Sequence, residues 1–188
     1  MVKVASVRPD PVTPPTTKSD EAKPHHHRMA QQQGDDYRSA LTHMAEKVAM
    51  TGAETQAGDM IVALAIEAAE GMYEWSGQGL EWLEPHEQNI HIEVSARDAA
   101  DNRFIPGLDV RVRVLDGEGE VRAKGQLPLL WHPWLYHYGA NFAVPEDVEL
   151  NVEVEIDAPD FPRHDKENGR RYTEDVFVRF DDVRISGP

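Results

Sequence analysis

Polar and apolar residues alternate along four stretches of the chain after residue 88, a period of two that is typical of strands with one buried face. These stretches are NIHIEVSA (89–96), GLDVRVRVLD (107–116), ELNVEVEID (149–157) and EDVFVRFDDVRI (174–185). The earlier run MIVALAIE (60–67) is apolar almost throughout and indicates a buried strand. Turn signals such as DGEG (116–119) separate the stretches. Roughly six to eight short strands at this spacing predict an all-β fold, an antiparallel β-sandwich.

The residues before these strands divide into two parts of different composition. The first 35 residues carry five prolines and a triple histidine among mainly polar side chains, so we expect an arm without fixed structure. The next stretch has its apolar residues on one helical face, with Asp35 or Asp36 as N-cap and Gly52 as the stop. The chain is therefore predicted as three parts: a disordered Pro-rich arm (1–35), one short helical segment (36–52) and a β-sandwich domain (58–188).

Charge and composition narrow the classes of function. The chain has 34 acidic and 19 basic residues, a formal net charge of −15, which argues against nucleic acid as a partner and permits cation binding. Only six of the basic residues are lysines, and an acidic, lysine-poor composition suggests a halophilic source. The absence of cysteine excludes disulfides, thiolate catalysis and a lipid-attachment cysteine.

Targeting signals are also missing from the printed sequence. The first residues contain no apolar run long enough for a signal peptide, and no later stretch is long enough to span a membrane. We therefore expect a soluble protein that stays where it is made, the cytoplasm being one such location, unless a leader has been removed.

One strand and one loop carry chemistry that suits a metal ion. His91 and Glu93 stand two residues apart in NIHIEVSA, so their side chains share a face with Cα atoms about 6.5–7 Å apart. Imidazole and carboxylate together suit Fe, Cu or Zn rather than Mg or Ca. His137 lies in the aromatic stretch WHPWLYHYGANF (131–142), and His164 lies in a polar connection. Each feature alone also fits an ordinary solvated surface.

Taken in order, the motifs resemble a known family. MIVALAIEAAEGMY, NIHIEV, KGQLPLLW, HYGANF and a late PRH…NG resemble the bacterial periplasmic metal-binding proteins of high-affinity ferrous iron uptake, over approximately residues 58–183. The resemblance implies an immunoglobulin-like sandwich that forms a homodimer and binds copper and iron without catalysis. Its metal ligands carry over as His91, Glu93, His137 and His164.

The same resemblance leaves some positions open. Leu130 stands where the family has a methionine ligand, which weakens the expectation of copper(I). Met72 and His132 are candidate auxiliary residues, although packing explains both. Trp131 and Trp134 are expected in the core or in a dimer contact.

Three functions from different classes follow. The first is an accessory protein for iron or copper uptake, not an enzyme, with a membrane iron permease as a candidate partner. The second is a carbohydrate- or peptide-binding sandwich that stacks ligands on the aromatic loop Trp131–Tyr138. The third is a mononuclear metal enzyme, for which the sequence offers no separate general acid or base. The accessory protein explains the most residues, and Fe or Cu is the expected metal, with Zn also suited.

Overall fold

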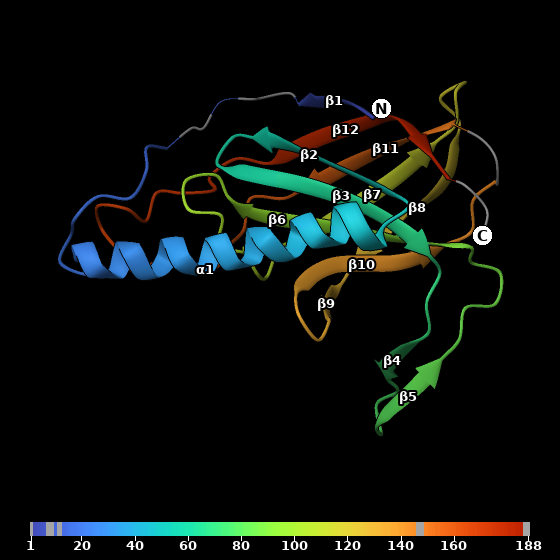
Figure 1. Cartoon of the computed structure of the whole chain (residues 1–188), viewed down its shortest axis with the longest axis horizontal. Coiled ribbons are helices and arrows are strands. Elements are labelled where there is room, and N and C mark those ends of the chain that lie inside the picture. The colour runs from blue at the N-terminus through green and yellow to red at the C-terminus, as the bar shows by residue number, and fades with distance from the viewer. Residues whose placement is uncertain (1, 7–9, 11–12, 146–148, 186–188) are drawn as a thin grey trace.

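Two antiparallel sheets stack face to face in the part of the chain that the structure describes, a computed structural model covering residues 2–6, 10, 13–145 and 149–185 (Figure 1). Parts of the predicted arm (1–35) and of the predicted domain (58–188) lie outside the described residues. In chain order the elements are β1 (Lys3–Ser6), α1 (Pro24–His43), the π-helical turn η1 (Met44–Val48), β2 (Thr51–Ala57), β3 (Met60–Ala68), β4 (Met72–Trp75), β5 (Leu80–Leu83), β6 (Ile90–Asp98), β7 (Val110–Leu115), β8 (Val121–Leu127), β9 (Leu129–Trp131), β10 (Tyr136–Phe142), β11 (Glu149–Ile156) and β12 (Val176–Arg184).

The strand order shows how the sandwich is assembled. One sheet has the order β1-β12-β11-β7-β8 and the other β2-β3-β6-β10-β9, and a two-stranded hairpin, β4-β5, stands apart from both among the described residues (Figure 1). Each alternating stretch of the sequence forms a strand of these sheets. The predicted antiparallel β-sandwich is confirmed.

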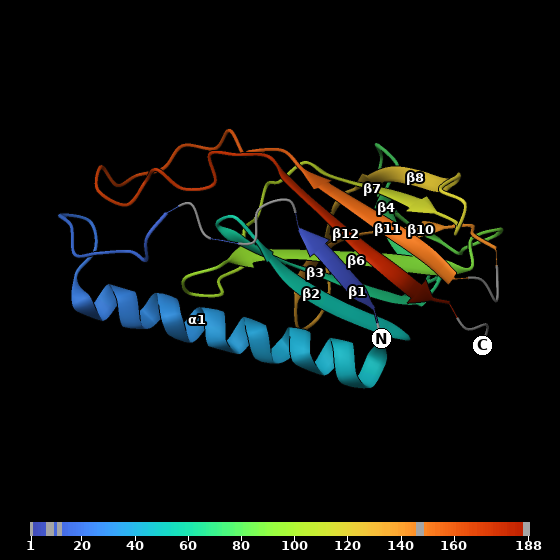
Figure 2. The ribbon, with the colours of Figure 1, turned by 90° about the horizontal axis from the view of Figure 1, so that it is seen from above.

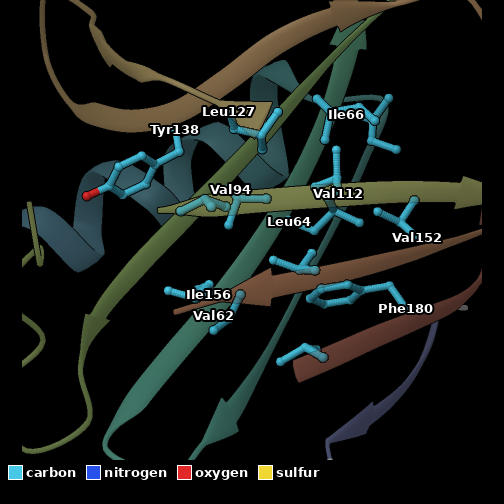
Figure 3. Close-up of a cluster of buried hydrophobic side chains, with 14 of the residues drawn as sticks. Val62, Leu64, Ile66, Val94, Val112, Leu127, Tyr138, Val152, Ile156 and Phe180 are labelled. Carbon is cyan, nitrogen blue, oxygen red and sulfur yellow. The ribbon is translucent and has the colours of Figure 1, made fainter. Parts of the chain in front are cut away.

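The core lies between the sheets and is built from the alternating apolar positions. Val62, Leu64 and Ile66 of β3 point toward Val152 of β11 and Phe180 of β12, and all five are at most 1% exposed (Figure 3). Removal of such side chains from water is the main stabilising contribution in a fold of this kind. The opposite face of β3 carries the small residues Ala63 and Ala65, and it is covered from outside by the N-terminal helical segment.

The N-terminal part of the chain differs from the prediction. β1 pairs with β12, and the helix begins at Pro24 rather than at Asp35 or Asp36. Proline fits the first turn because it has no N–H to leave unpaired. The adjacent Lys23 N–H donates to His26 Nδ1 at 3.2 Å, which caps the start in place of an aspartate. The triple histidine therefore lies in the first turn of a helix.

Contacts with the sandwich explain why this segment is ordered. Arg171 Nη2 donates to the Pro14 carbonyl at 2.6 Å, and Ser19 Oγ donates to Asp165 Oδ2 at 2.7 Å. Gly34 lets α1 approach the backbone, because a methyl group there would lie 1.6 Å from Asp101 O. These tertiary contacts override the polar composition, which was the basis for predicting a disordered arm.

The same helix lies along the outer face of the β2-β3-β6-β10-β9 sheet, so the molecule has a third, helical layer there (Figures 1 and 2). Gly52 does not end the helix as predicted. It lies in β2, where a methyl group would come within 2.9 Å of Ala45 Cβ, so its lack of a side chain lets η1 dock closely. No helix in the described residues is both long and apolar enough to cross a membrane.

Candidate metal centre

His91 and Glu93 of β6 and His137 of β10 meet on the sheet face under the helix. One ligand atom from each lies within 4.8 Å of the others, and all three residues are at most 5% exposed. His137 Nε2 is 3.3 Å from Glu93 Oε1, and the two imidazole rings are 5.9 Å apart, nearly perpendicular at 82°. The convergence predicted from sequence for these three residues is present in a single chain.

Strand register accounts for this meeting. β10 runs antiparallel to β6 with Gly139 opposite Glu93 and Asn141 opposite His91. Because side chains alternate along a strand, His137, Gly139 and Asn141 lie on the same face as His91 and Glu93. Two histidines 46 positions apart in sequence are thus brought together by one ladder.

Gly139 lets both histidine rings lie close to the β10 backbone. A methyl group at this position would lie 2.6 Å from His91 Nε2 and 3.1 Å from His137 Cδ2. Any larger residue would displace one or both rings. The HYGAN motif therefore combines a candidate ligand with a glycine that allows the two rings to approach the same strand.

Asn141 fixes the orientation of His91. Its Nδ2 donates to the Glu70 carbonyl at 2.7 Å, so its Oδ1 faces His91 Nδ1 at 2.9 Å. Nδ1 must then carry the hydrogen, and Nε2 presents its lone pair toward the space above Gly139. Such a partner on the second nitrogen is a usual feature of histidines that bind metals.

Burial keeps all three candidate ligands uncharged. It lowers the pKa of His137 to about 3, with smaller contributions from His91 and His132. Burial also lowers the pKa of His91, although the hydrogen bond to Asn141 opposes this shift. Burial raises the pKa of Glu93 to about 8, and the charges of Glu67 and Glu70 add to the effect. At neutral pH the centre holds two neutral imidazoles and a protonated carboxyl group.

These properties fit a transition-metal ion. Both ring nitrogens of His137 are buried without a hydrogen-bond partner among the described residues, which is costly for polar atoms unless a ligand occupies the site. Two nitrogens and a carboxylate suit Fe(II), Cu(II) or Zn(II), and three ligands leave at least one coordination position open. The donor set therefore supports the predicted choice of metals.

The remaining candidate residues lie elsewhere. The His164 side chain is 93% exposed and pairs with Glu21 at 3.6 Å, outside the cluster that the described residues form. The ligand role of His164 stays a prediction, because within one chain this side chain does not reach the other three candidate ligands. Met72 lies in β4, paired with Leu83 of the projecting hairpin. The His132 ring is 6.4 Å from that of His137 and packs on Trp134, so it borders the centre.

Sequence reasoning missed two acidic neighbours of the centre. Glu67 of β3 pairs with His91 in the sheet and is 8% exposed. Burial and the nearby Glu70 raise the pKa of Glu67 to about 7. Glu67 is the one charged residue of the run MIVALAIE and ends it, and a charged residue in a buried strand is the signal that could have identified it.

Comparison with solved structures supports the fold. The copper-bound glutamate-to-glutamine variant of FetP from uropathogenic Escherichia coli strain F11 superposes with a TM-score of 0.59 at 19% identity, covering 73% of this chain and 91% of that one. Copper-reconstituted P19 from Campylobacter jejuni gives 0.58 at 21% identity, covering 73% and 96%. A copper-bound methionine-to-isoleucine variant of P19 gives 0.55 at 21% identity, covering 69% and 92%.

Sequence comparison gives the family. No curated protein matches the chain significantly. Residues 43–187 match the family described as Fe2+ transport protein, a stretch that contains the His91–Glu93–His137 cluster and both sheets except β1. Because this match spans well over half of the chain, the protein belongs to the Fe2+ transport protein family.

Proposed function

We propose that the protein is an accessory protein of iron or copper uptake that binds one transition-metal ion through His91, Glu93 and His137. The observation that carries the proposal is the convergence of these three side chains within 4.8 Å of one another. The unpartnered nitrogens of His137, and a glycine at position 139 that lets both rings approach β10, support this assignment. The family match, which describes transport, agrees with the prediction of an accessory protein rather than an enzyme.

The centre suits an ion that is carried rather than kept. His91 and His137 offer lone pairs without first losing a proton, because burial holds both in the neutral form. Glu93 must release its proton when the cation arrives, so uptake and release of metal are coupled to a proton. The metal ion is the cargo. A ligand of the accepting protein can bind the ion at the open coordination position.

The family and the structural neighbours favour different metals. The matched family is described by Fe2+, while the FetP and P19 structures named above are copper-bound or copper-reconstituted. Two imidazoles and a carboxylate accept either ion, and availability decides occupancy as much as affinity does. We therefore propose Fe(II) and copper as cargo, with a membrane iron permease as the receiving partner.

We further propose that the protein forms a homodimer through its exposed aromatic surface. Trp131 is 71% exposed, Tyr136 49% and Trp134 41%, all in or beside the β9–β10 connection. Large aromatic side chains are enriched in protein interfaces because each removes much area from water at a small entropic cost. Light scattering of the wild type and of Trp131→Ala tests this, and a monomeric wild type would exclude the dimer.

Metal-dependent stability tests the proposed centre. A ligand at a hundredfold excess over its Kd stabilises the folded state by about 2.7 kcal/mol, which raises the melting temperature of a chain of this size by roughly 5–10 °C. His137→Ala should abolish most of this rise for Fe(II) and Cu(II). His164→Ala is the comparison variant, because it removes a predicted ligand that is exposed and pairs with Glu21 in one chain.

The possible results separate the candidate sites. A rise that persists in His137→Ala would move metal binding away from the proposed centre, for instance to the histidines at 25–27. A rise that is lost in both variants would support His164 as a fourth ligand.

A further inference from the structure

The junction between α1 and β2 places a methionine over the metal centre. After α1 the chain makes the π-helical turn η1, whose first residue, Met44, is 3% exposed. Met44 packs with Ala65 and Leu135. Ala65 is the β3 partner of Glu93 in the sheet, and Leu135 lies two residues before His137. Met44 therefore rests on the neighbours of two proposed ligands that come from different strands.

A pocket connects this methionine with the ligands. It has a volume of about 270 Å³, lies between η1 and the sheet, and its lining includes Met44, Glu93 and His137. Ser95 and Ala65 also line the pocket. The space next to the proposed ligands is thus closed on its helical side by the turn that carries the Met44 thioether.

Two contacts hold the turn close to the sheet. The lack of a side chain at Gly52 lets Ala45 approach β2, as the overall fold requires. Tyr37 donates its hydroxyl hydrogen to the Tyr136 carbonyl at 2.6 Å, which ties α1 to the start of β10 directly before His137. The position of Met44 therefore depends on the docking of α1 and η1 against the sheet, and the sandwich by itself would not fix it.

We propose that the Met44 sulfur is a further ligand of the ion bound by His91, Glu93 and His137. Met44 has three rotatable side-chain bonds and can adjust its sulfur within the pocket, and π-turns occur frequently at functional sites. A thioether is a soft ligand that selects Cu(I), so Met44 gives a nitrogen- and oxygen-based centre affinity for cuprous ion. This inference rests on the proposed function and adds that the N-terminal helical segment takes part in metal binding.

Cuprous affinity provides the test. Met44→Leu keeps nearly the same volume, so it should fold, while it removes the sulfur. Under anaerobic conditions, competition with a chromogenic chelator should show Cu(I) binding at least about tenfold weaker in Met44→Leu, with Zn(II) binding changed by less than about threefold. Met60→Leu removes a sulfur that is 1% exposed in the sandwich core, and Met50→Leu removes one at 39% exposure after η1. Both controls should bind Cu(I) as the wild type does.

X-ray absorption of the Cu(I)-loaded protein gives a direct measurement. The wild type and both control variants should show one sulfur scatterer at a bonding distance of about 2.3 Å, and Met44→Leu should lack it. Cu(I) affinity within twofold of wild type and no sulfur in any sample would overturn the proposal, as would loss of sulfur in Met50→Leu instead. His137→Ala separates the two ideas: if it binds metals as the wild type does, the proposed function fails as well.

Discussion

In the proposed centre, the proton on Glu93 determines how metal affinity depends on pH. Burial and two acidic neighbours raise the pKa of this carboxyl group to about 8, whereas burial lowers the pKa of His137 to about 3 and also lowers that of His91. Between pH 7 and 8 the only one of the three proposed ligands that must lose a proton to bind metal is therefore Glu93. We predict that apparent affinity rises with pH until Glu93 is ionised.

The magnitude follows from competition between one proton and one metal ion. Apparent Kd scales as 1 + 10^(pKa − pH), so the Glu93 proton alone, with a pKa of about 8, makes the affinity about fivefold weaker at pH 7 than at pH 8, and about 50-fold weaker at pH 6. Ligands with ordinary pKa values would behave differently. Two unperturbed histidines would lose less than about twofold from pH 8 to 7, and then about 60-fold from pH 6 to 5.

Calorimetric titration with Zn(II), which has no redox chemistry, measures both the affinity and the protons released. Titration at pH 7 in buffers of different ionisation enthalpy should give close to one proton released per ion bound. Glu93→Gln keeps the shape of the side chain and should abolish the release, with weaker binding that no longer varies between pH 8 and 7. Affinity that is flat from pH 8 to 7 and falls with a two-proton slope below pH 6.5 would refute this account of the centre.

Three further results are expected. Gly139→Ala should weaken metal binding by about 10–100-fold while the protein stays folded, as measured by titration and circular dichroism, because the methyl group would meet the His91 ring at 2.6 Å. Phe180→Ala, at a core position with 0% exposure, should cost about 3–5 kcal/mol in urea unfolding. Asp98→Ala should cost a similar amount, since it removes the buried partner of Arg171 at 3.1 Å. A cost below about 1 kcal/mol for either of the last two would contradict the packing described.

The sandwich could be predicted from sequence because the alternation of apolar and polar residues within each strand shows which face of that strand is buried. In ELNVEVEID and GLDVRVRVLD the apolar positions fix which side is buried, and the two strands pair in the structure with those residues opposed, as Val152 is with Val114. Because the side-chain period is two, a slip of one residue would turn these apolar side chains to the solvent face. Pairing partners, by contrast, depend on the whole chain, and no local pattern indicated that β1 would join β12.

The centre was predictable where ligand spacing follows a strand, and less so where it depends on loops and added segments. His91 and Glu93 share a face by strand geometry alone, and the HYGAN motif supplied His137. The connection that carries His164 has no periodicity, and in one chain the structure places this histidine beside Glu21 instead. The docking of α1 and η1 over the pocket beside Glu93 and His137 could not be predicted from sequence either. The polar composition of residues 24–35 indicates disorder, and only their contacts with the sandwich show otherwise.

The acidic surroundings of the centre explain why a neutral site can bind a cation. Glu67 and Glu93 keep their protons in the folded, metal-free protein up to higher pH than an exposed carboxyl group does. From about pH 4.5 up to their raised pKa values, these groups therefore destabilise the metal-free fold as pH rises, because only the unfolded chain releases the protons freely. An ion bound by His91, Glu93 and His137 reverses this, since it stabilises ionised Glu93. The same burial that makes the empty centre costly thus favours a positive charge there, and in the proposed function protonation of Glu93 releases the ion.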